Sequence, residues 1–207
     1  MTDRVLIVTA RYPVLGEVKS RLAADIGQEA ALSVYRRLLD RCAAVISDAE
    51  LETFLFFTGT DDPATREQFS SMGCRIESQC EGDIGVRMQH AFQSVWQVYP
   101  GAKLVLMGTD VPDASARIIH TAFEALNRND AVIGPAADGG YYLVGLRSPE
   151  PAIFSGIAWS TETVRAQTLE VLHSKGKSVA LVDELHDIDY LADLQASIHF
   201  PEYTSEQ

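Results

Sequence analysis

Asp110 stands where the most informative apolar run of the chain ends. Residues 103–107 (Lys-Leu-Val-Leu-Met) break into Gly108 and then Asp110, with Asp113 three residues further on. A buried parallel strand that ends in this way carries a carboxylate to the edge of a sheet where open α/β folds bind ligands. Such a carboxylate can ligate Mg²⁺ or Mn²⁺, with a substrate's phosphates completing the shell. We therefore predict that Asp110 is a metal ligand and that Asp113 caps the following helix.

A second acidic pair, Asp187 and Asp189, also lies between a predicted strand and a predicted helix. Side chains two residues apart point the same way in an extended segment, so both can reach the site that Asp110 faces. Either is a candidate second metal ligand, and helix capping by Asp189 is the alternative. We expect His186 beside them to be structural, because hard cations prefer oxygen.

Positive charge gathers in the loop after the first predicted strand. Arg11, Lys19 and Arg21 lie within this loop, which also contains Gly16. A phosphate-binding loop occupies this place in a doubly wound sheet. Arginine can grip phosphate through two hydrogen bonds, and lysine acts there as a point charge. We predict that these residues bind a nucleotide's phosphates. A solvated basic loop is the alternative, and the spacing of Gly16 and Lys19 does not match a P-loop.

Two further turns contain glycines. Gly82 comes just before a predicted helix, and Gly85 and Arg87 lie near the start of that helix. The free N–H groups at a helix N-terminus can bind an anion. We therefore add these three residues to the predicted nucleotide site.

The second glycine turn, residues 138–140, joins two predicted strands. Asp138 could act as a catalytic base, and the bare N–H groups of Gly139 and Gly140 could contact an acceptor. Asp-Gly is also ordinary hairpin-turn chemistry, so a purely structural turn is the alternative.

Strands and helices alternate along the chain. Continuous apolar runs predict buried strands, and apolar residues at spacings of three and four predict amphipathic helices. This alternation predicts a three-layer α/β fold with a mostly parallel sheet. The strands at 131–134 and 141–145 are too close for a crossover helix, so we expect them to be antiparallel and the sheet to be mixed. The other strands are predicted at 5–8, 54–57, 74–77, 103–107 and 179–182. Helices are predicted at 28–49, 63–72, from about 84 to 99, at 114–126, from 159–162 to about 173, and up to about 198.

Composition limits the classes of function. The chain has 207 residues, of which 46% are hydrophobic and 22% charged, which suits one domain over residues 1–200 with a polar tail at 201–207. A net charge of −12 argues against nucleic-acid or membrane-surface partners. The three cysteines outline neither a disulfide framework nor a zinc motif, and no run is long enough for a signal-peptide core or a membrane span. We expect a cytoplasmic protein.

Six motifs, taken in order, resemble a bacterial family of small GT-A-type glycosyltransferases. This family is often labelled nucleotide-diphospho-sugar transferases, and some members are linked to arsenosugar biosynthesis. The resemblance runs from Val5 to about Leu194. The motifs are RYPVLGEVKSRL from Arg11, EGDIGVRM from Glu81, GTDVPD from Gly108, DGGYYLVGL from Asp138, WST from Trp159 and DID from Asp187.

The resemblance implies a Rossmann-like nucleotide-diphospho-sugar transferase fold, shared with nucleotidyltransferases such as molybdenum-cofactor guanylyltransferase. It also implies that Asp110 is the metal-binding aspartate at the strand end, that the loop from Arg11 to Arg21 binds nucleotide phosphates, and that Asp187 or Asp189 is the second acidic position. The chain departs from the family pattern at Ser20, where threonine is common. It also departs at residues 190–193, where Tyr-Leu-Ala-Asp replaces Thr-Pro-Glu-Asp.

Three functions are compatible with these residues. The first is metal-dependent glycosyl transfer from a nucleoside diphosphate sugar to a small-molecule acceptor, with Asp110 holding the metal. If the reaction inverts configuration, Asp138 would deprotonate the acceptor hydroxyl. The second is nucleotidyl transfer, in which a phosphorylated acceptor attacks a nucleoside triphosphate. The third is a non-catalytic nucleotide-sugar-binding protein, because related folds host different functions.

Overall fold

A single mixed sheet organises the computed structural model, which describes residues 2–203. Its strands are β1 (Arg4–Arg11), β2 (Glu52–Thr58), β3 (Arg75–Ser78), β4 (Lys103–Met107), β5 (Ala131–Pro135), β6 (Tyr141–Leu146) and β7 (Val179–Leu181). The helices are α1 (Ser20–Ile26), α2 (Gln28–Ala49), α3 (Pro63–Ser71), α4 (Ile84–Val98), α5 (Ala116–Ala125), α6 (Val164–Ser174) and α7 (Leu191–Ala196), with 3-10 turns at Pro151–Phe154 and Pro201–Tyr203.

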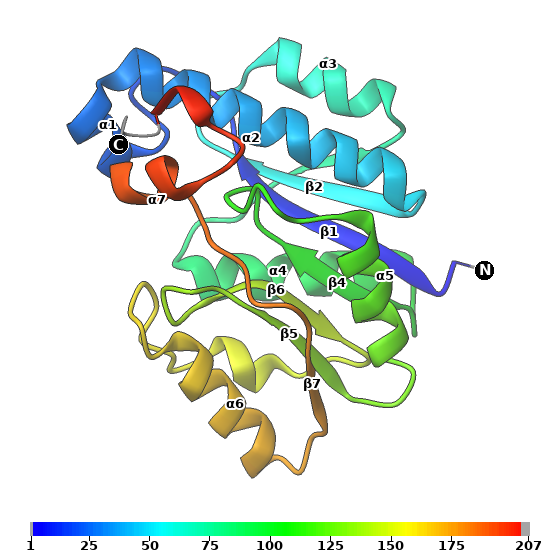
Figure 1. Ribbon diagram of the computed structural model, residues 1–207. Coiled ribbons are helices and arrows are strands. Elements are labelled where there is room, and N and C mark those ends of the chain that lie inside the picture. The colour runs from blue at the N-terminus through cyan, green and yellow to red at the C-terminus, as the bar shows by residue number, and fades with distance from the viewer. Residues whose placement is uncertain (1, 204–207) are drawn as a thin grey trace.

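The strand order is β3-β2-β1-β4-β6-β5-β7 (Figure 1). β1 pairs in parallel with both β2 and β4, and β6 runs antiparallel to β4 and β5. The predicted mixed, mostly parallel α/β sheet is therefore confirmed. Val8 of β1 lies opposite Met107 of β4. Because these two strands end side by side, the segments that carry Arg11 and Asp110 leave the sheet at one edge.

Alternate residues of β1 enter two different cores. Leu6 and Val8 pack with α2, α3 and α5, whereas Val5 and Ile7 pack with α4 and α6 on the other face. All four side chains are fully buried. Burying one such side chain contributes roughly 1.5–3 kcal/mol, so both layers of helices hold the central strand in place. Within residues 2–203, no helix is both long and apolar enough to cross a bilayer.

Three local predictions are corrected. α5 begins at Ala116 and is capped by Ser115, whose side chain accepts from the Ile118 N–H; Asp113 instead bonds the ring of His199 at 2.7 Å. α6 begins at Val164, five residues after Trp159, because Ser160 takes a left-handed conformation (φ 64°) that interrupts a helix. α1 was not predicted at all. Of the predicted tail, residues 204–207 lie outside the described part of the chain.

Candidate functional site

Two adjoining cavities open at the carboxyl ends of β1 and β4. The smaller cavity has a volume of about 360 Å³ and the larger one of about 680 Å³. Both are bordered by Thr9, Arg21, Asp110 and Asp189. The strand ends predicted to carry the chemistry therefore meet at one divided site.

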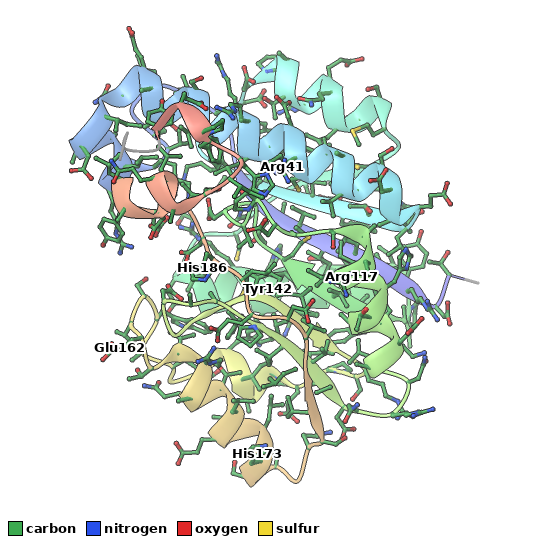
Figure 2. All side chains as sticks on the ribbon, viewed as in Figure 1. Arg41, Arg117, Tyr142, Glu162, His173 and His186 are labelled. Carbon is green, nitrogen blue, oxygen red and sulfur yellow. The ribbon has the colours of Figure 1, made fainter. Side chains whose placement is uncertain are left out.

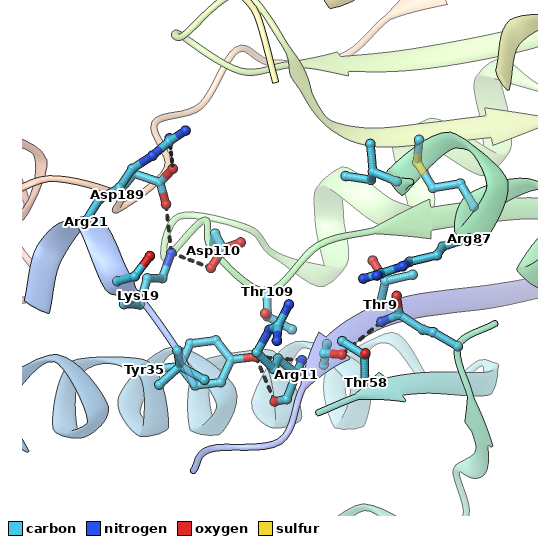
Figure 3. Close-up of a pocket in the computed structure, with 16 residues that line it drawn as sticks. Thr9, Arg11, Lys19, Arg21, Tyr35, Thr58, Arg87, Thr109, Asp110 and Asp189 are labelled. Atoms are coloured by element: carbon cyan, nitrogen blue, oxygen red, sulfur yellow. Dashed lines mark hydrogen bonds and ion pairs between the residues drawn. The ribbon is translucent and has the colours of Figure 1, made fainter. Parts of the chain in front are cut away.

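Lys19 lies at the boundary between the two cavities. Its ammonium group contacts the carboxylate of Asp110 and lies 3.1 Å from Oδ1 of Asp189 (Figure 3). Only 5% of the Lys19 side chain is exposed. Burial alone would lower the pKa of Lys19, but the two carboxylates outweigh it and raise the pKa above its ordinary value. Lys19 is therefore a charged, almost buried cation between two aspartates.

The backbone at Lys19 is unusual for a residue with a side chain. Its φ and ψ of 48° and 47° are left-handed, and its carbonyl accepts from the Ala23 N–H as α1 begins. A left-handed conformation costs a non-glycine residue about 1–2 kcal/mol. Such strain persists where surrounding contacts hold it, as the two aspartates do here.

The segment 187–189 is fixed against the end of β4 by the backbone. The Ile188 N–H donates to the Asp110 carbonyl at 3.0 Å, and the Ile188 side chain is buried. Asp187 and Asp189 flank this anchor. Asp189 also pairs with Nη1 of Arg21 at 3.0 Å. The contact of Asp189 with Arg21 joins residues that are 168 positions apart in the sequence.

Tyr35 on α2 fixes the backbone at the end of β1. Its hydroxyl accepts from the Arg11 N–H and donates to the Arg11 carbonyl, both at 2.9 Å (Figure 3). Burial, together with the charge of Asp110, raises the pKa of Tyr35 to about 12, so the hydroxyl stays protonated. The sequence does not single out Tyr35 for this role, because its spacing in the helix is also that of a core residue.

Gln79 was also missed. It borders the smaller cavity, and its Nε2 donates to the carbonyls of Ala10 and Phe56, each at 2.9 Å. These two acceptors fix the orientation of the amide. No periodicity in the sequence marks this position, because its partners belong to two neighbouring strands.

The larger cavity is acidic and aromatic. Asp138 and Asp187 border it, with Trp159 and Tyr141 in an edge-to-face contact. Burial, and next the charge of Asp138, raises the pKa of Asp187 to about 6. Among residues 2–203, neither of these two aspartates forms an ion pair. Figure 2 shows two other lining residues, His186 near the middle of the molecule and Glu162 on the loop ahead of α6.

The predicted charged residues reach the site, and most of the predicted glycines do not. Arg11, Lys19, Arg21 and Arg87 border the smaller cavity, and Gly140 borders the larger one. Neither cavity is bordered by Gly16, Gly82, Gly85 or Gly139.

Close packing explains two of these glycines. A Cβ at Gly85 would lie 2.5 Å from Nε1 of Trp159, and one at Gly139 would lie 2.2 Å from the Glu162 carbonyl oxygen. Gly139 also has a φ of 91°. Asp138 accepts from the Gly140 N–H at 2.8 Å, so it shapes the turn while it borders the larger cavity.

Of the three candidate metal ligands, Asp110 and Asp189 form a pair, and Asp187 is separate from them. Asp110 and Asp189 share the ammonium group of Lys19, so their carboxylates can hold one cation together. Across residues 2–203, no cluster of three or more acidic, histidine or cysteine side chains is arranged to hold a metal ion. Two carboxylates suit a Mg²⁺ or Mn²⁺ ion that takes its other ligands from phosphate and water.

The comparisons with solved structures agree with the fold. A proposed nucleotide-diphospho-sugar transferase from Desulfovibrio desulfuricans is 29% identical, with a TM-score of 0.87 over 99% of this chain and 90% of that chain. A Mycobacterium tuberculosis protein solved with manganese is 18% identical, with a TM-score of 0.56 over 95% and 97%. The 4-diphosphocytidyl-2C-methyl-D-erythritol synthase of Anaerococcus prevotii is 14% identical, with a TM-score of 0.60 over 93% and 92%.

No curated protein sequence matches the chain. Residues 39–161 match DUF2064, a family described as uncharacterized proteins conserved in bacteria. This match covers more than half of the chain, and the structural likeness extends over nearly all of it. The chain therefore belongs to the bacterial DUF2064 family, and it has the Rossmann-like fold of the GT-A nucleotide-diphospho-sugar transferases.

Proposed function

We propose that this protein is a metal-dependent glycosyltransferase that uses a nucleoside diphosphate sugar and a small-molecule acceptor. The observation that carries the proposal is the division of charge between the two cavities. Arg11, Lys19 and Arg87 border only the smaller cavity, whereas two carboxylates without an ion pair in residues 2–203, those of Asp138 and Asp187, border only the larger one, which is also lined by aromatic rings. A diphosphate fits the first environment, and an uncharged hydroxyl-bearing compound fits the second.

The smaller cavity would take the donor. Arg11, Arg21 and Arg87 can bind its diphosphate by charge-assisted hydrogen bonds, which also stabilise the leaving group as its charge grows. Asp110 and Asp189 would hold a Mg²⁺ or Mn²⁺ ion, whose charge neutralises the departing diphosphate. The manganese bound by the Mycobacterium tuberculosis protein of the same fold is in keeping with this ion.

The larger cavity would take the sugar and the acceptor. Trp159 and Tyr141 offer apolar faces, and Asp138 can accept the proton of the attacking hydroxyl. Asp138 is exposed and shows no ion pair in the described residues, so its carboxylate is free to act as a base.

Nucleotidyl transfer is the second candidate function. Two acidic positions that share one cation, Asp110 and Asp189, suit this reaction too, and the Anaerococcus prevotii synthase has the same fold. Its acceptor would carry a phosphate, however, and Asp138 and Asp187 would repel that phosphate from the larger cavity. This repulsion is why we favour glycosyl transfer.

Ligand screening followed by product analysis tests the proposal. A thermal-shift panel of nucleotide sugars and nucleoside triphosphates, with and without Mn²⁺, identifies the ligand that stabilises the native state. Product analysis should then detect a nucleoside diphosphate released from the sugar nucleotide. Pyrophosphate released from a triphosphate, without turnover of any sugar nucleotide, would establish nucleotidyl transfer instead. Binding with turnover of neither would establish a binding protein.

A further inference from the structure

The ammonium group of Lys19 occupies the place where a metal ion would contact Asp110 and Asp189. It touches both carboxylates, and its side chain is only 5% exposed, whereas those of Asp110 and Asp189 are 46% and 31% exposed. The ammonium group of Lys19 is thus the cation that both aspartates contact in this structure.

An ammonium group and a divalent ion compete for these oxygens. Mg²⁺ binds carboxylate oxygens at about 2.0–2.1 Å, which would bring it close to an ammonium group on the same atoms. The two cations would also repel each other strongly at such short range. A metal ion therefore has to displace Lys19, and an almost buried charge leaves its partners only at a high cost unless a new partner is at hand.

A phosphate group in the smaller cavity would be that new partner. Lys19 borders this cavity together with Arg11 and Arg87, and none of the three borders the larger cavity, so an anion bound there meets these cations. Once the ammonium group turns to the anion, both carboxylates become available. Arg21 pairs with Asp189, and within residues 2–203 it forms no ion pair with Asp110.

We propose that Lys19 keeps a divalent cation off Asp110 and Asp189 until a nucleotide's phosphates bind, and so makes metal and nucleotide binding cooperative. This inference rests on the proposed function for the identity of the ligands. Because coupling between two binding sites is reciprocal, Mn²⁺ must also strengthen nucleotide binding by the same factor.

The test measures Mn²⁺ binding to the full chain from the electron paramagnetic resonance signal of free Mn²⁺. With Mn²⁺ alone, Lys19→Met should bind the ion at least tenfold more tightly than wild type. Lys19→Arg, which keeps the positive charge, should stay as weak as wild type. Lys103→Met is the matched control, because it removes one positive charge at the opposite end of β4, where the ammonium group of Lys103 bonds Asn127 and forms no ion pair within residues 2–203.

Two further arms make the assignment specific. UDP or GDP should tighten Mn²⁺ binding to wild type at least tenfold, after correction for Mn²⁺ held by the free nucleotide, but should change Lys19→Met less than threefold. Adding Asp110→Asn to Lys19→Met should abolish the gain. Circular dichroism checks the fold, and Lys19→Gln supplies a second neutral variant should Lys19→Met fail to fold.

The proposal is overturned if wild type and both neutral variants bind Mn²⁺ alone equally well, or if Lys103→Met reproduces the gain. It is also overturned if the gain survives Asp110→Asn. The comparison with Mn²⁺ alone involves no turnover. Suppose that Lys19→Met binds Mn²⁺ more tightly than wild type but the protein turns over no sugar nucleotide. This result would refute the proposed function and still support the role of Lys19.

Discussion

The two cavities contain aspartates in opposite electrostatic situations. Asp110 and Asp189, on their shared wall, each contact a cation, whereas Asp138 and Asp187 in the larger cavity have no ion-pair partner in the described residues. The ion pairs with Lys19 fix the positions of the Asp110 and Asp189 carboxylates. Unpaired ones keep their capacity to accept protons or hydrogen bonds. The same residue type therefore has two uses within one site, and each use can be disrupted separately.

Asp110→Asn should have the largest effect. Loss of this carboxylate removes a predicted metal ligand, and we expect kcat for sugar-nucleotide turnover to fall at least about 100-fold, the order of effect seen when one preorganised charge-stabilising group is lost. Asp113→Asn is the matched control from the same loop, because Asp113 contacts His199 and borders neither cavity. If steady-state kinetics show an equal fall in kcat for both variants, Asp110 has no specific role in the site.

Asp138→Asn tests the unpaired side of the comparison. As the predicted base, Asp138 should contribute about 100-fold to kcat, near the lower limit for general-base catalysis. Affinity for the donor nucleotide should not change, because Asp138 does not border the smaller cavity.

Glu170→Gln removes a similar negative charge from the exposed face of α6 and serves as the control. Weaker donor binding at Asp138→Asn, with an unchanged kcat, would contradict the assignment of separate roles to the two cavities.

Stability against pH should separate the two kinds of aspartate. The pKa of Asp187 is raised from its usual range to about 6, so between about pH 4 and pH 6 the folded state binds more protons than the unfolded state. This raised pKa makes wild type lose stability as pH rises through that window. Asp187→Asn should therefore match wild type near pH 4 and exceed it at pH 7 by about 1 kcal/mol, a figure reduced for the screening of a partly exposed group.

Asp189→Asn should change stability in the opposite direction. It leaves Lys19 buried with one carboxylate instead of two, and we expect a loss of about 1–2 kcal/mol at pH 7, less than for a fully buried pair. Urea denaturation at several pH values measures both differences. If both variants are less stable than wild type at pH 7, the Asp187 carboxylate is paired in solution.

The charged part of the site was predictable because its signals are local. Asp110 follows one buried strand and Arg11 is the last residue of another, and the carboxyl ends of parallel strands in one sheet meet at one edge. The pairing of Lys19 with Asp189 was not predictable, since it depends on the Ile188 N–H bonding the Asp110 carbonyl across the fold.

The glycines and the helix starts show what local patterns cannot settle. Gly85 was interpreted as part of an anion site, but it is needed because Trp159, far along the chain, packs against it. Asp113 has the chemistry of a helix cap, yet Ser115 takes that position while His199 binds Asp113. In each case a residue distant in sequence decides between two roles that the local pattern allows equally.

Tyr35→Phe should have the smallest effect on function and tests the fixed backbone of the smaller cavity. It removes the two hydrogen bonds that hold the Arg11 backbone, and it should cost about 1 kcal/mol of unfolding free energy per net hydrogen bond lost. Because Arg11 borders the smaller cavity, nucleotide affinity should also fall a few-fold. Tyr142→Phe is the matched control, since its hydroxyl donates to the Asp183 carbonyl from the wall of the larger cavity. Both variants should lose stability, but only Tyr35→Phe should bind nucleotide more weakly. Equal nucleotide affinity in calorimetric titrations would mean that the position of Arg11 does not depend on Tyr35.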